Sequence, residues 1–117
     1  MTIEARKYET IVITKPDLDE HVASSLANKF EEIVKNHNGS IINKTDMGKR
    51  KLAFPIKKNS KGNFILYYYS GNPSVIREIE RQLNISEEIL RFQTIRITDE
   101  SNMTQVDLKE ISQEEEQ

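Results

Sequence analysis

Positive charge is concentrated at residues 48–58, which read GKRKLAFPIKK. Five of these eleven residues are Lys or Arg, whereas the five in the middle, residues 52–56, carry no charge. Ammonium and guanidinium groups bind phosphate oxygens, and a cluster of them is the electrostatic footprint of a polyanionic partner. Lysines also keep the edges of sheets soluble, so a solvated hairpin is the competing interpretation. We favour the polyanionic partner.

The net charge of the whole chain conceals this cluster. It is −2 over 117 residues, yet residues 1–98 carry +4 and residues 99–117 carry −6. Within the first part, residues 44–61 hold seven basic side chains and one acid. The last segment is acidic, poor in aromatic residues and ends EEEQ, which predicts disorder. We therefore divide the chain into a folded domain, 1–98, and an acidic tail, 99–117.

Residues for other kinds of chemistry are missing from the sequence. There is no cysteine, which excludes disulfides and thiolate metal sites. His21 and His37 fall at opposite ends of one expected helix and cannot converge there on a metal ion or a nucleophile. No phosphate-binding glycine loop and no pair of catalytic acids can be assigned. We expect no enzyme activity, no cofactor and no metal and, without a signal peptide or membrane span, a cytoplasmic location.

The pattern of apolar residues predicts six secondary-structure elements. Two helices are expected, one between Asp17 and Asn38 and one between Asn72 and Asn84. Extended segments are expected at 7–14, which is rich in β-branched and aromatic residues, and at 40–56, 64–69 and 89–97. The order βαββαβ predicts an α+β, ferredoxin-like fold, in which two helices cover one face of a four-stranded antiparallel sheet.

Local signals predict how these elements begin and end. Asp17 with Glu20 has the spacing of a capping box, and Gly39 is expected to end the first helix with positive φ. Gly48 predicts a bulge in the second extended segment. The sequence Asn-Ser-Lys-Gly at 59–62 predicts the turn of a long hairpin.

Two helices on one face leave the other face of the sheet uncovered. Residues 64–69 alternate two sets of side chains, and both sets are apolar or aromatic. Only one set can lie under the helices, so the other set faces lysine stems, water or a partner. We assign Tyr67 and Tyr69 to the surface that binds a partner protein.

The basic segment has two possible modes of RNA binding. Alternation places Lys49 and Lys51 on one side of the strand and Arg50 on the other, unless a bulge changes the register. Such residues contact phosphates without reading sequence. Alternatively, the chain is a free-standing single-strand RNA-binding module, since residues 61–68 partly match the third-strand motif of RNA-recognition domains. In that match Asn63 and Ile65 replace the rings that stack on bases.

The chain resembles the bacterial small-subunit ribosomal protein six family over about residues 5–97. The segments that carry the resemblance are RKYET at 6–10, KPDL at 15–18, GKRKLAFPIKK at 48–58, Gly62, and ILRF at 89–92. The block at 48–58 is the longest and most specific of them.

The resemblance implies a non-catalytic, structural role in the small ribosomal subunit. Members of this family bind the central domain of small-subunit ribosomal RNA together with ribosomal protein eighteen of that subunit, with which they form a heterodimer. The uncovered sheet face or the hairpin edge is then expected to contact the partner protein. By motif position, the residues expected to contact RNA are Arg6, Lys7, Lys49, Arg50, Lys51, Lys57, Lys58 and Arg91.

Overall fold

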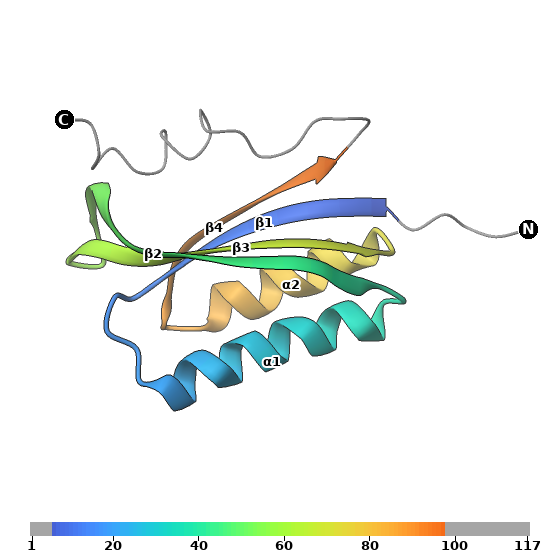
Figure 1. The fold of residues 1–117 in the computed structure, drawn as a ribbon, viewed down its shortest axis with the longest axis horizontal. Coiled ribbons are helices and arrows are strands. Elements are labelled where there is room, and N and C mark those ends of the chain that lie inside the picture. The colour runs from blue at the N-terminus through green and yellow to red at the C-terminus, as the bar shows by residue number, and fades with distance from the viewer. Residues whose placement is uncertain (1–5, 98–117) are drawn as a thin grey trace, which may run out of the picture.

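The computed structural model describes residues 6–97, which form the βαββαβ order that the sequence predicts (Figure 1). The strands make one antiparallel sheet in the order β2-β3-β1-β4. Both helices cover the same face, which confirms the ferredoxin-like fold. The elements are β1 (Arg6–Thr14), α1 (Glu20–Asn36), β2 (Ser40–Ile56), β3 (Asn59–Gly71), α2 (Ser74–Ile85) and β4 (Ile89–Ile97). The acidic segment 99–117 lies outside the described residues.

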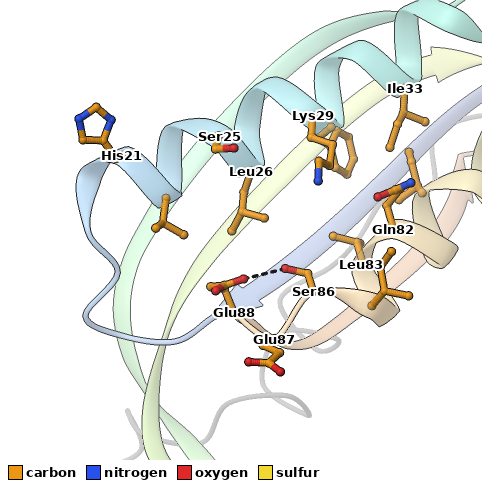
Figure 2. Close-up of a pocket in the computed structure, with 14 residues that line it drawn as sticks. His21, Ser25, Leu26, Lys29, Ile33, Gln82, Leu83, Ser86, Glu87 and Glu88 are labelled. Atoms are coloured by element: carbon orange, nitrogen blue, oxygen red, sulfur yellow. Dashed lines mark hydrogen bonds between the residues drawn. The ribbon is translucent and has the colours of Figure 1, made fainter.

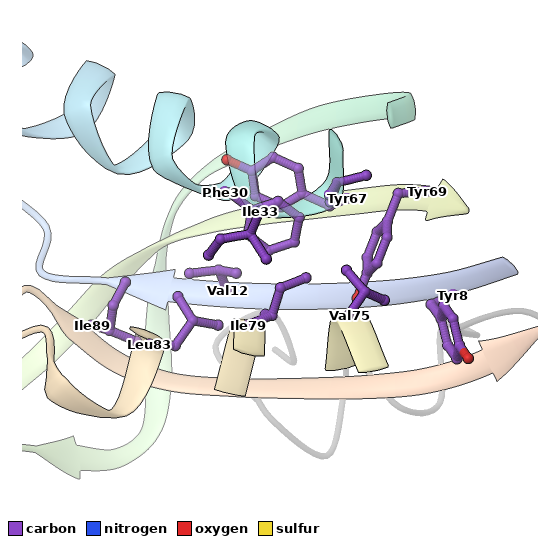
Figure 3. Close-up of a cluster of buried hydrophobic side chains, with 11 residues drawn as sticks. Tyr8, Val12, Phe30, Ile33, Tyr67, Tyr69, Val75, Ile79, Leu83 and Ile89 are labelled. Carbon is purple, nitrogen blue, oxygen red and sulfur yellow. The ribbon is translucent and has the colours of Figure 1, made fainter. Parts of the chain in front are cut away.

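The main core lies between the helices and the sheet (Figure 3). Phe30 of α1 stacks on the ring of Tyr67 at a centroid distance of 3.9 Å and meets the ring of Tyr69 edge-on at 5.4 Å. Burying a side chain of this size stabilises the fold by about 1.5–3 kcal/mol. We call this group the helix cluster; its buried members are Tyr8, Val12, Phe30, Ile33, Val34, Tyr67, Tyr69, Val75, Ile79, Leu83 and Ile89.

A short chain of hydroxyl groups crosses the buried end of the helix cluster. The Thr10 hydroxyl lies 2.8 Å from the Tyr69 hydroxyl and 2.7 Å from the Thr94 hydroxyl, so β3, β1 and β4 are linked. Burial raises the pKa of Tyr69 to about 12, although its hydrogen bonds to Thr10 and Thr94 oppose this shift. The buried hydroxyl group of Tyr69 therefore has hydrogen-bond partners within the protein.

A second core lies on the opposite face of the sheet. Leu52, near the tip of β2, packs against Ile13 of β1, Phe64 of β3 and Leu90 of β4. These strands span the sheet, so the tip of the β2–β3 hairpin must bend over this face; Figure 1 shows it turning away from the helices. We call this face the hairpin side, and the residues Ile11, Ile13, Leu52, Phe64 and Leu90 the hairpin cluster.

The turn of the hairpin lies two residues earlier than the sequence predicts. Ile56 pairs with Asn59, so the two turn residues are Lys57 and Lys58, both with positive φ (50° and 68°). Positive φ at both turn positions matches the right-handed twist of hairpin strands, and such turns usually contain Asn-Gly. Lys57 and Lys58 lack this signature, so the sequence predicted the turn at 59–62 instead. Here the Asn59 amide holds the turn by donating to the carbonyl oxygens of Ile56 and Lys57.

The ends of α1 also differ from their prediction. The N-cap residue is Asp19 rather than Asp17, and it makes no side-chain capping hydrogen bond. After the helix, Asn38 rather than Gly39 has positive φ. Gly39 is needed for another reason, because a Cβ atom there would collide with the carbonyl oxygen of Ser70. This close approach, invisible in the sequence, lets β2 leave the helix directly alongside β3.

Candidate nucleic-acid interface

The register of the hairpin decides which way Arg50 points. Arg50 pairs with Gly62, and residues paired across an antiparallel ladder project to the same side of the sheet. A Cβ atom on Gly62 would lie 2.6 Å from Cγ2 of Ile13 and 3.5 Å from Cδ1 of Leu90. Both of these residues belong to the hairpin cluster. Arg50 therefore projects to the hairpin side.

The predicted bulge at Gly48 is confirmed and sets this register. Asp46 pairs with Ile65 whereas Gly48 pairs with Phe64, so Met47 is the extra residue on β2. Gly48 has a φ of 83°, a conformation that glycine adopts without strain. One extra residue reverses the side to which every following side chain points.

Two more of the predicted cations share the hairpin side with Arg50. Arg91 pairs directly with Ile13, whose side chain lies in the hairpin cluster. Lys7 lies six residues before Ile13 on β1 and therefore points to the same face. Arg91 and Arg50 sit on the two edge strands, β4 and β2, with the apolar hairpin cluster between them. The structure thus brings three of the eight predicted residues to one face.

The other predicted cations on the strands point toward the helix side. Lys49 pairs with Asn63, and its ammonium group lies 3.3 Å from a carboxylate oxygen of Asp17, in the loop before α1. Lys51 and Arg6 have the same side-chain direction by alternation, on β2 and β1. The eight residues are thus divided between the two faces and the turn.

The two lysines of the turn have different environments. The Lys57 ammonium group donates a hydrogen bond of 3.1 Å to the carbonyl oxygen of Ile89, at the start of β4. It therefore fastens the bent hairpin to the far edge of the sheet. Lys58 is exposed at the next position, where its charge faces solvent.

The assignment of Tyr67 and Tyr69 to a partner-binding surface is wrong. Tyr69 is fully buried and Tyr67 is 3% exposed, and Figure 3 shows both rings between the sheet and the helices. Burial raises the pKa of Tyr67 to about 12, with a further contribution from the nearby carboxylates of Glu31 and Asp46. Alternation alone could not decide between the two sets of side chains, because both are apolar; the contact with Phe30 decides it.

A groove of about 630 Å³ lies between α1 and α2 (Figure 2). Because both helices cover the same face of the sheet, the groove is on the opposite side from Arg50 and Arg91. Its floor is apolar, with Leu26, Phe30 and Leu83, and its rim carries charged groups such as Lys29 and Glu88. Within residues 6–97 no group of His, Cys, Asp and Glu side chains could hold a metal ion. Over the same residues, no helix is long and apolar enough to cross a membrane. We assign no chemistry to this groove.

One surface feature of the basic hairpin, the exposure of Phe54, was not predicted from the sequence. This ring is 60% exposed, although it sits in the apolar centre of the segment 48–58. An aromatic residue directly before Pro55 in a charged hairpin was the only available signal, and it does not by itself distinguish a buried ring from an exposed one.

Comparison with known proteins gives a consistent result. The family model described as "Ribosomal protein S6" matches residues 7–96. The small ribosomal subunit protein bS6 of Pelobacter propionicus is 38% identical over 111 residues, which cover 95% of this chain and 86% of that protein. Its counterpart in Sulfurimonas denitrificans is 46% identical over 91 residues, which cover 78% of this chain and 66% of that protein.

A solved structure agrees with the sequence matches. The crystal structure of 30S ribosomal protein S6 from Thermotoga maritima superposes with a TM-score of 0.73 at 29% identity, covering 80% of this chain and 89% of that one. These findings confirm the resemblance that the segment 48–58 indicated. They also confirm the expectation of a non-enzyme, because the relatives are named as proteins of the small ribosomal subunit.

Proposed function

Because the chain belongs to the family of small ribosomal subunit protein S6, we propose that it binds the central domain of small-subunit ribosomal RNA through its basic hairpin side. The observation that carries this proposal is the register that turns Arg50 to the same face as Arg91 and Lys7. These groups bind phosphates and position the protein on the ribosome, where it has a structural role in translation.

The apolar hairpin cluster gives these cations a rigid base. Arg50 and Arg91 flank the buried residues Ile13, Phe64 and Leu90, so they are held at a fixed separation across the sheet. Fixed cations lose less conformational entropy on binding than cations on a mobile loop. Lys58, at the tip, extends the positive surface beyond the sheet.

We place ribosomal protein eighteen of the small subunit, as the second partner, on the first part of the β2 edge. Ile42, the extra residue between the pairs Ile41–Tyr69 and Asn43–Tyr68, is 46% exposed there. Residues 40–43 carry no charge, unlike residues 49–58 further along β2. An uncharged strand edge with an exposed apolar side chain fits a protein partner, and the basic half fits RNA.

The alternative of an RNA-recognition type module finds no support in this geometry. The hairpin side of β3 carries Phe64, Leu66 and Tyr68, so the motif positions 63 and 65 point toward the helices. Phe64 is 1% exposed under the bent hairpin tip. A ring that is covered in this way cannot stack on a base.

Charge reversal at Arg50 tests the proposed RNA surface. Arg50→Glu should weaken binding to central-domain ribosomal RNA and reduce the slope of log K against log salt by about 1 or more. The matched control is Arg77→Glu, since Arg77 is exposed on α2, on the opposite side of the sheet. Equal affinities for the two variants, measured by filter binding over a salt series, would exclude this face as the RNA surface.

Sedimentation tests the ribosomal role separately. A tagged chain should migrate with the small subunit in a sucrose gradient of a gentle lysate, and it should leave that position once RNase disperses the particle. Migration at the top of the gradient, as a small free protein, would contradict the proposed function.

A further inference from the structure

The ring of Phe54 is more exposed than any other aromatic ring of the protein. The chain has four Phe and four Tyr residues, all within the described part. Five of these rings are at most 5% exposed and two are partly buried, whereas Phe54 is 60% exposed. A single exposed apolar residue is common in proteins, so the exposure alone decides nothing. The backbone around the ring adds the next observation.

An irregularity in the hairpin aims Phe54 outward. Lys51 pairs with Lys61 and Ile56 pairs with Asn59, so five steps along β2 correspond to only two along β3. Simple alternation would give Leu52, Phe54 and Ile56 one common direction. Instead Leu52 is buried and Ile56 packs against the hairpin cluster, while Phe54 is turned to solvent. Extra residues in a ladder redirect side chains in this way.

The ring is presented on a firm support. Leu52 and Ile56 anchor the segment on both sides of Phe54 in the hairpin cluster. Pro55 restricts the backbone of the residue before it to extended conformations. The hydrogen bond from Lys57 to the carbonyl oxygen of Ile89 fastens the tip to β4. An exposed ring held in this way loses little entropy when a ligand covers it.

The charge around the ring indicates the chemistry of its ligand. The segment 48–58 holds no acid; of its five cations, Lys49 and Lys51 point toward the helix side, which leaves Arg50, Lys57 and Lys58 near the hairpin tip. The acid just before the segment, Asp46, accepts a hydrogen bond from the Gly48 amide. A ring among fixed cations matches the sites that bind unpaired nucleotides, where phosphates meet the cations and a base stacks on the ring. A protein partner at this point would have to be strongly acidic.

We propose that Phe54 stacks on an unpaired base, so that the hairpin tip binds a single-stranded nucleotide of the RNA next to the phosphates held by Arg50 and Lys58. This inference rests on the proposed function, and it adds a preference for unpaired RNA that cations alone do not provide, because phosphates are present in duplex and single strand alike.

Two RNA probes and one substitution test this inference. The probes are a short fluorescent single strand of mixed A and U, and the same strand paired to its complement. Phe54→Leu should bind the single strand roughly 5- to 100-fold more weakly than the wild type, as expected for one lost base stack. It should bind the duplex within about twofold and keep the salt slope, because no phosphate contact is removed. Its thermal unfolding should be unchanged, since the side chain is exposed.

A spectroscopic readout reports stacking directly. The chain has no tryptophan, so Phe54→Trp introduces the only indole. The single strand should quench its fluorescence, and the duplex should leave it unchanged. An unquenched indole would overturn the proposed stacking, and so would equal single-strand affinities of Phe54→Leu and the wild type. A Phe54→Leu protein that keeps its RNA affinity and loses only binding to the protein partner would also overturn it. If the wild type binds neither of the two probes nor central-domain RNA, the proposed function itself is contradicted.

Discussion

The helix cluster and the hairpin cluster lie on opposite faces of the same sheet, and they are built differently. The helix cluster contains three tyrosines and a chain of hydroxyl groups that ends at Thr94. The hairpin cluster is made only of Ile, Leu and Phe side chains. Helices cover the first, whereas a bent hairpin that carries the basic residues covers the second. One face therefore holds the main core, and the other combines a smaller core with the candidate RNA surface.

Substitutions on the two faces of the sheet are therefore expected to have different effects on stability and on RNA binding. A change in the helix cluster reaches Arg50 only through the stability of the whole domain. A change in the hairpin cluster alters stability and also the support of Arg50 and Phe54. Substitutions matched in chemistry, one in each cluster, can therefore test whether the interface depends on the hairpin support.

The largest expected effect is alkaline destabilisation, and it comes from two tyrosines of the helix cluster. Burial raises the pKa of Tyr67 and of Tyr69 from 10 to about 12 in the folded protein. Below pH 10 both states keep these protons and stability is unaffected; between pH 10 and 12 the unfolded chain releases them first, so the free energy of unfolding falls. The loss is roughly 2–3 kcal/mol for each tyrosine. Urea unfolding followed by circular dichroism from pH 8 to 12 measures it.

The control for this titration is Tyr67→Phe, which keeps the ring on Phe30 and removes one ionisable hydroxyl. Its stability should fall less steeply above pH 10 than that of the wild type. Identical slopes for the two proteins would show that Tyr67 does not contribute to the alkaline transition.

Matched leucine truncations should have similar costs in stability and different effects on RNA binding. Leu52→Ala in the hairpin cluster and Leu83→Ala in the helix cluster each remove a buried side chain, so each should cost about 2–5 kcal/mol. Leu52→Ala should also weaken binding to central-domain RNA at a temperature where both variants remain folded, because it loosens the support of Arg50. Chemical denaturation and filter binding measure the two effects. Equal RNA affinities would show that the hairpin cluster does not hold the interface.

The smallest expected effect distinguishes the two lysines of the turn. Lys57→Met loses the hydrogen bond to the carbonyl oxygen of Ile89 and should lower the free energy of unfolding by about 0.5–1.5 kcal/mol. Lys58→Met, the neighbouring control with the same change in charge, should leave stability nearly unchanged and reduce the RNA salt slope by about 1. The reverse result would mean that Lys57 faces the RNA and Lys58 supports the fold.

Much of the fold was predictable because it depends on local patterns. The segments 40–56 and 89–97 were predicted with the bounds they have in the structure; 89–97 is a run of extended-favouring residues, and 40–56 lies between the Asn-Gly that ends the first helix and the residues that form the hairpin turn. The bulge at Gly48 followed from the residue type itself. The turn was misplaced because Lys57 and Lys58 have no intrinsic preference for positive φ, and the Asn59 side chain that holds them there acts from outside the turn.

The candidate site was predictable in composition and not in arrangement. The basic residues of 48–58 were evident from charge alone. Their division between the two faces depends on the register across β2 and β3, which is set by the extra residue Met47; the sequence predicted a bulge at Gly48 and not the side to which the following residues point. The wrong assignment of Tyr67 and Tyr69 has another cause, since both sets of side chains on 64–69 are apolar and only the contact with Phe30 decides between them.

By itself, the sequence determined the order of elements, the family and the chemistry of a basic, non-catalytic surface. These properties reside in residue types and in periods of two or 3.6 residues, which neighbours along the chain define. Only the tertiary structure decided which face of the sheet each side chain occupies. That choice depends on contacts between distant residues: Phe30 on Tyr67, Leu52 on the hairpin cluster, and the irregular ladder that leaves Phe54 exposed.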